Sequence, residues 1–172
     1  MASKGSGRSP QARSRVGQFL WQIDQAYDGK SWHGTNLRGS LRRVTLDQAA
    51  WRPEPGRHNI WELALHAAYW KYAVRRRLTG EARSSFPLDG SNFFTRPDAG
   101  TEAEWARDLA LLRDEHGKLR AAVAGLSDPA LDRPPSGGET LTVDLVAGII
   151  AHDLYHAGQI QLLKRLVPRR YT

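Results

Sequence analysis

The spacing of apolar residues indicates helices along most of the chain. Residues 15–27 carry apolar side chains three and four positions apart, which predicts an amphipathic helix. After a break at residues 28–30, residues 37–44 continue at helical intervals, and this short piece is expected to end at Thr45. We interpret the two pieces as one first helix that is broken in the middle.

Three longer helices are predicted farther along the chain. The first of them covers residues 59–77 and opens with Asn59 and Glu62 at the spacing of a capping box. The other two are expected over residues 101–126 and 141–167, where apolar residues again recur every three or four positions. In each helix these apolar residues form a stripe along one side, and this stripe marks the face that would pack against the other helices.

The fold class follows from these helices and from what separates them. Residues 80–100 have no periodicity and are punctuated by glycine and proline, which indicates a long crossover connection. No stretch alternates like a strand, and no segment is repeated. The sequence therefore predicts an all-α, four-helix bundle over residues 15–167, with a disordered basic tail at 1–14 and a short tail at 168–172.

The composition is that of a soluble globular domain. Of the 172 residues, 40% are hydrophobic and 25% are charged. No apolar run approaches the roughly 20 residues of a membrane span, and the first 15 residues lack the apolar core of a signal peptide. We therefore expect a cytoplasmic protein with no membrane association.

The net charge of +7 is concentrated at the two ends of the sequence. Residues 1–15 and 164–172 each contain four basic residues and no acidic residue, and residues 16–163 are close to neutral. A folded basic face is not expected, so nucleic acid is not the expected partner.

The absence of cysteine narrows the possible chemistry. It excludes disulfides, thiolate metal sites and a cysteine nucleophile. Any metal site must be built from histidine, aspartate, glutamate or water.

Two histidines in the last helix are the first candidate site. His152 and His156 are four residues apart and so lie one turn apart on the same helix face. This is the spacing by which one helix offers two imidazoles to a metal ion. The pair alone is equally compatible with two core histidines that are satisfied by hydrogen bonds.

A third inward histidine favours the metal interpretation. His66 falls on the apolar stripe of the helix at 59–77, as His152 and His156 fall on that of the last helix. Three histidines from two helices match an open metal site, in which water or substrate takes the remaining position. A structural zinc site would use four protein ligands.

A zinc peptidase is the alternative weighed for the same motif. His152-Asp153-Leu154-Tyr155-His156 has the spacing of the His-Glu-x-x-His helix, with Asp153 in the position of the glutamate. That class takes its third ligand from farther along the chain. No histidine, aspartate or glutamate follows His156, which argues against a peptidase.

Two stretches carry a family resemblance. Residues 58–70 (His-Asn-Ile-Trp-Glu-Leu-Ala-Leu-His-Ala-Ala-Tyr-Trp) and 152–160 (His-Asp-Leu-Tyr-His-Ala-Gly-Gln-Ile) resemble the two signature helices of the DinB superfamily. Trp32-His33-Gly34 and the connector Pro53-Glu54-Pro55-Gly56 resemble the segments that precede the first signature. The likeness covers about residues 15–167.

The resemblance implies a metal and a class of reaction. It implies a four-helix bundle with a long crossover and a divalent ion, nickel or zinc, bound by His66, His152 and His156. Some members of the family are similar to bacillithiol or mycothiol S-transferases or to a mycothiol-dependent maleylpyruvate isomerase. The resemblance also implies a homodimer, and a low-molecular-weight thiol as a possible co-substrate.

The remaining histidines allow more than one role. His116 lies on the stripe of the third long helix and either lines the pocket or is a satisfied core histidine. For His33, pocket lining and simple capping are equally compatible with its position. His58 precedes the N-cap and is expected to face solvent. Glu62, one turn before His66, is explained by its capping role.

Four more residues near the two signatures are assigned structural roles. Gly158 is expected to permit close approach of a helix, and Tyr155 and Gln159 are interpreted as packing or rim groups. Trp61 is expected on the outer side of its helix, where it would indicate a partner surface.

Three functions fit these observations. The first is a metal-dependent S-transferase that activates an external thiol for attack on a small electrophilic substrate. The second is a non-enzymatic stress-response bundle in which the metal fixes the helix packing. The third is a metal-dependent hydrolase of small molecules. Residues with a catalytic role other than metal binding cannot be chosen from the sequence.

Overall fold

The computed structural model describes residues 13–83 and 85–168, and within them it contains helices and no strand. The all-α prediction is therefore confirmed. Most of the predicted tails, residues 1–12 and 169–172, lie outside the described residues. In chain order the elements are α1 (Arg15–Tyr27), α2 (Leu37–Ser40), α3 (Leu46–Ala50), α4 (Ile60–Thr79), α5 (Glu102–Ala124), the 3-10 helix η1 (Asp128–Asp132) and α6 (Thr142–Leu166).

The ends of the long helices follow from their local sequence. The side chain of Asn59 accepts the Glu62 backbone N–H at 2.8 Å at the start of α4. Thr101 and Glu104 form a capping box at the start of α5. Gly80 ends α4 with φ of 73°, a left-handed conformation that glycine adopts without strain. None of the described helices is long and apolar enough to cross a membrane.

The second piece of the first helix differs from its prediction. Thr45 does not end a helix. It forms a capping box with Gln48 and begins α3, which the apolar spacing did not reveal. The chain therefore turns twice between α1 and α4, through two short helices.

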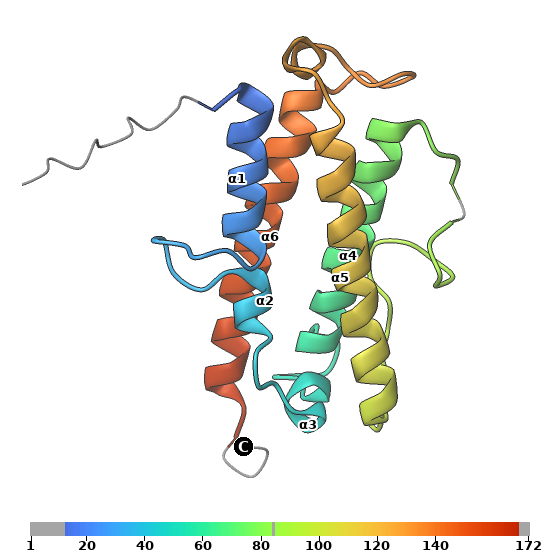
Figure 1. Ribbon diagram of the computed structural model, residues 1–172. Helices are drawn as coiled ribbons and strands as arrows, with labels where there is room; N and C mark the ends of the chain where they lie inside the picture. The colour runs from blue at the N-terminus through green and yellow to red at the C-terminus, as the bar shows by residue number, and fades with distance from the viewer. Residues whose placement is uncertain (1–12, 84, 169–172) are drawn as a thin grey trace, which may run out of the picture.

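The four long helices form a bundle, as Figure 1 shows. Helix α4 packs against α5 and α6, and α1 packs against the same two neighbours. In Figure 1 α1 and α6 run downward while α4 and α5 run upward, so α4 and α5 are parallel. The connection between two parallel helices has to return along the bundle.

That connection, residues 80–101, lies along α4. Its backbone is hydrogen-bonded first to Tyr72, then to His66 and finally to Glu62, each nearer the start of α4 than the last. The contacts show that the segment runs antiparallel to the helix it has just left. It thereby forms a wall beside the first turns of α4.

A buried polar layer divides the core into two apolar clusters. One cluster contains Leu63, Leu112 and Ile160, and the other contains Val74 and Val146, among others. Between them, α4, α5 and α6 carry charged side chains that the apolar pattern did not predict as buried. The most buried members of this layer are Lys71, Glu115 and Asp153.

Trp61 corrects another prediction. Its ring is fully buried between α4 and α5, where Nε1 donates to Asp108 Oδ2 at 2.8 Å and the ring packs edge-on against Trp105. A Cβ at Gly100 would meet the Trp61 ring at 2.6 Å, so the connection can pass over it only because residue 100 is glycine. Trp61 therefore belongs to the core and not to a partner surface.

Candidate metal centre

Three imidazole nitrogens meet where α4 and α6 face each other. His152 Nε2 lies 3.1 Å from His66 Nε2 and 3.0 Å from His156 Nε2. His66 and His156 are buried, whereas His152 is half-buried. The structure thus brings together the three histidines that the two helical stripes predicted. Their donor atoms are grouped as they would be around a metal ion.

In two of the three histidines, a hydrogen bond at Nδ1 leaves Nε2 free to bind a metal. The Nδ1–H of His66 donates to the backbone carbonyl of Asn92 at 2.9 Å. The Nδ1–H of His156 donates to Gln159 Oε1 at 2.6 Å, and the Gln159 amide donates to the Tyr155 hydroxyl. With Nδ1 protonated, each Nε2 of a neutral ring presents a lone pair to the centre.

Asn92 reaches His66 because of an unusual backbone conformation. Its φ is 68°, in the left-handed region that asparagine tolerates better than most residues. Its side-chain oxygen also accepts the Trp70 Nε1–H at 3.0 Å. The residue therefore links the crossover segment both to a candidate ligand and to the next turn of α4. It was missed in the sequence because no periodicity or motif marks it.

Burial keeps the imidazoles neutral. Removal from water lowers the pKa of His66 to about 4 and that of His152 to about 3, and each of these rings is further disfavoured as a cation by its histidine neighbours. Burial also lowers the pKa of His156. A neutral imidazole is the form that binds a metal.

The donor set fits a divalent metal ion. Two imidazoles at about 2.0–2.1 Å from a tetrahedral zinc have nitrogens roughly 3.3 Å apart, close to the separations found here. The Nε2 lone pairs of His66 and His156 lie next to Nε2 of His152. A single metal ion can bind all three of these nitrogens at once. In the described part of the chain no fourth histidine or carboxylate joins the group.

The centre lies in a cleft of about 810 Å³ between α4, α6 and the two segments that flank α4. Its walls are mainly apolar and include Leu63, Trp70, Phe93 and Leu162. Such a cleft is of the size that holds a small molecule. A small molecule can therefore reach the open side of the histidine group.

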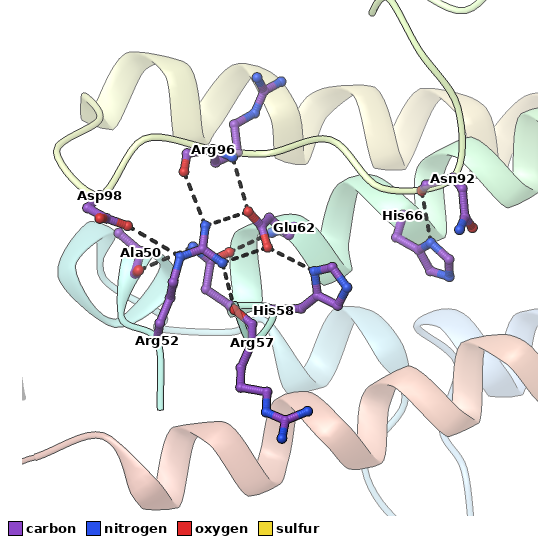
Figure 2. Close-up of polar contacts among 10 residues, drawn as sticks. Ala50, Arg52, Arg57, His58, Glu62, His66, Asn92, Arg96 and Asp98 are labelled. Carbon is purple, nitrogen blue, oxygen red and sulfur yellow. Dashed lines mark hydrogen bonds and ion pairs between the residues drawn. The ribbon is translucent and has the colours of Figure 1, made fainter. Parts of the chain in front are cut away.

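Glu62 organises the segments beside the cleft, as Figure 2 shows. The buried carboxylate accepts two hydrogen bonds from Arg52, at 2.5 and 2.8 Å, one from His58 at 3.0 Å and one from the Arg96 backbone N–H at 3.2 Å. Burial raises its pKa, but these hydrogen bonds outweigh the effect and lower the pKa to about 2. The carboxylate is not part of a capping box, which corrects the sequence interpretation.

His58 is exposed, as predicted, but it also contributes to the cleft. Its side chain is 47% exposed, yet it lines the cleft and stacks on Phe93 with ring centroids 3.7 Å apart. Phe93 in turn stacks on His66 at 3.9 Å. The position of His58 before the N-cap predicted the exposure but not its place beside the three histidines.

Two other histidines lie away from this cleft. His116 is buried in the core against Tyr27, with ring centroids 3.6 Å apart, and among the described residues no group is hydrogen-bonded to its Nδ1. It is therefore a core histidine, although not a satisfied one. His33 is exposed and lies beside α6 in a separate groove.

Asp153 supplies a direct argument against a peptidase. Its side chain is buried on the side of α6 that faces Lys71, and the two are joined by an ion pair of 2.5 Å. It does not line the cleft. The residue in the position of the catalytic glutamate is therefore part of the polar layer in the core.

One comparison with known proteins gives a match. A family model described as the DinB superfamily matches residues 31–160, which contain all three histidines and the crossover segment. No curated protein and no solved structure matches the chain.

Proposed function

The chain belongs to the DinB superfamily, and on this premise we propose that it is a metal-dependent S-transferase whose metal ligands are His66, His152 and His156. The ion would be nickel or zinc. The co-substrate would be a low-molecular-weight thiol that attacks a small electrophile. The observation that supports the proposal is the convergence of three imidazole Nε2 atoms at the floor of an apolar cleft.

The thiol has to come from outside because the chain contains no cysteine. A divalent ion at this position supplies Lewis acidity, which lowers the pKa of a coordinated thiol and makes a thiolate available at neutral pH. In the transfer, a sulfur–carbon bond forms at the electrophile and the leaving group departs with the bonding electron pair. The proton of the thiol passes to a base and then to the leaving group or to solvent.

The protein would contribute position and a dry environment. Asn92 and Gln159 hold two of the imidazoles in the orientation that directs Nε2 into the cleft. Trp70, Phe93 and Leu162 provide apolar walls that exclude water from the reacting atoms. The electrophile is expected to lie against these walls, over the open side of the centre.

The first experiment measures metal content. Wild-type protein is expected to bind one nickel or zinc ion per chain after reconstitution, and His66→Ala, His152→Ala and His156→Ala are each expected to lose at least about tenfold in affinity. His33→Ala, in an exposed residue of another groove, is the matched control. Metal binding that is unchanged in all three variants would remove these residues as ligands.

The second experiment tests the reaction. Metal-loaded protein is assayed with several low-molecular-weight thiols and a chromogenic electrophile, with apo-protein as the control. Stoichiometric metal without turnover of any thiol would contradict the transferase proposal. Hydrolysis of esters or amides without added thiol would indicate the hydrolase, and an increase in melting temperature alone would indicate the metal-stabilised bundle.

A further inference from the structure

The cleft contains one more histidine, and its hydrogen bonding resembles that of a catalytic base. His58 Nδ1 lies 3.0 Å from Glu62 Oε2, on a carboxylate that is 4% exposed and is held by two hydrogen bonds from Arg52. A carboxylate acceptor at Nδ1 selects the tautomer with the proton on that nitrogen. Nε2 of His58 then carries the lone pair, and among the described residues no group is hydrogen-bonded to it.

Phe93 links the His58 ring to the metal centre. Phe93 stacks almost parallel to His58, with an angle of 5° between the rings, and almost parallel to His66, with an angle of 12°. The two centroid separations of 3.7 and 3.9 Å place the His58 and His66 rings within about 8 Å of each other. All three rings line the same cleft.

From this arrangement we propose that His58 is the proton acceptor for a thiol bound at the three-histidine centre, and that Glu62 is its positioning residue. The inference rests on the proposed transferase function and deepens it. The S–H bond breaks, the proton moves to His58 Nε2, and the sulfur lone pair forms the bond to the electrophilic carbon while the bond from that carbon to the leaving group breaks. His58 then returns the proton to the leaving group, as a general acid.

The charges around His58 are compatible with this role. Glu62 faces it from α4, and Arg52 neutralises part of that carboxylate charge. Arg57 and Glu54 line the same cleft on the preceding connector and form an ion pair with each other, at 4.0 Å. His66, His152 and His156 also line the cleft and are committed to the metal in the proposed function, and Tyr155 lies at its edge.

The decisive experiment follows thiol binding and does not depend on turnover. Cobalt-loaded protein is mixed rapidly with 2-mercaptoethanol, and absorption reports the rate at which sulfur coordinates. A thiol has to lose its proton to bind as a thiolate. Wild-type protein is therefore expected to bind it at least about tenfold faster than His58→Gln, in which the proton has lost its acceptor beside the centre.

Kinetics provide the second readout. His58→Gln is expected to lower kcat by a factor of about 10²–10³ without loss of metal, and added imidazole is expected to restore part of the activity of His58→Ala. His33→Gln is the matched control, since this residue is exposed in a separate groove. Equal rates of sulfur coordination in wild type and His58→Gln, together with a change in kcat below about threefold, would overturn the proposal.

The role of Glu62 is tested by non-additivity. Glu62→Gln is expected to lower kcat by about tenfold with little change in KM, and to have no further effect on kcat in protein that already carries His58→Gln. An equal additional loss in that background would show that Glu62 only supports the fold. If wild-type cobalt protein gave no sulfur absorption at all, the transferase function would fail and not merely the assignment of His58.

Discussion

At the scale of single residues, His116 shows what burial does to an imidazole that lacks a hydrogen bond. It is 7% exposed, stacks on Tyr27 and lies near the buried ammonium of Lys71. Burial, with a smaller contribution from the Lys71 charge, lowers the pKa of His116 to about 3. The residue is therefore neutral in the folded protein at any pH near neutrality.

This depressed pKa predicts a loss of stability in mild acid. In the unfolded chain His116 binds a proton below about pH 6.5, whereas in the folded protein it binds one only near pH 3. Between these two pH values protonation stabilises the unfolded chain alone, so unfolding becomes more favourable as the pH falls. His116→Phe keeps the stacking on Tyr27 and removes the titration. Between pH 7 and pH 5 the variant should lose about 2 kcal/mol less unfolding free energy than wild type, as measured by urea denaturation.

A matched variant separates this effect from a general loss of histidine. His33→Gln removes an exposed histidine and is expected to follow the wild-type pH dependence. If His116→Phe and wild type lost stability in parallel over this range, His116 would not be the residue that resists protonation.

The candidate metal ligands were predictable from sequence because helical spacing alone shows which face of its helix each histidine occupies. His152 and His156 share one helix face by spacing alone, and His66 lies on an apolar stripe. Glu62 and Asn92 were not predictable in the same way. The partners of Glu62 come from residues up to 34 positions away, and Asn92 acts through a backbone carbonyl that any residue possesses.

At the scale of elements, the crossover is attached to α4 at the metal centre itself. The carbonyl of Asn92 accepts from His66, and its side chain accepts from Trp70 one turn farther along. Binding of a metal to His66 Nε2 would strengthen the hydrogen bond at Nδ1. Metal binding and the placement of the crossover are therefore expected to stabilise each other.

Substitutions at Asn92 test this coupling. Asn92→Val places a β-branched residue at φ of 68° and should displace the carbonyl, lowering metal affinity by about ten- to a hundredfold. Asn92→Gly retains the conformation and the carbonyl and should stay within a few-fold of wild type. Metal should also slow amide hydrogen exchange of residues 91–96 in wild type but not in Asn92→Val. Equal metal affinities for the valine and glycine variants would contradict the coupling.

The apolar pattern predicted neither the short helices nor the buried polar layer. The long helices have enough turns to show a stripe, whereas α3 has five residues and is visible only through its capping box. Lys71 and Asp153 read as surface residues because each is charged, but they are buried as a pair between α4 and α6. Periodicity cannot show that two charges on different helices will neutralise each other.

At the scale of the whole molecule, the outer face of α6 lacks charge. No exposed charged side chain occurs between Asp144 and Lys164, because Asp153 is turned inward. Small residues line much of this face, together with two large exposed side chains, Tyr155 and Leu162. An uncharged face can meet an identical face of a second copy without bringing like charges together.

We therefore predict that the homodimer implied by the family resemblance forms through α6. Leu162→Arg would place one guanidinium from each copy near the shared axis and should raise the dimer dissociation constant at least about tenfold, as measured by sedimentation equilibrium. Ala106→Arg adds the same charge on the exposed side of α5 and should leave the dimer intact. A wild-type monomer at all concentrations would contradict the dimer. A dimer that tolerates Leu162→Arg would show that the copies meet through another face, leaving the cleft mouth at Tyr155 and Leu162 open to solvent.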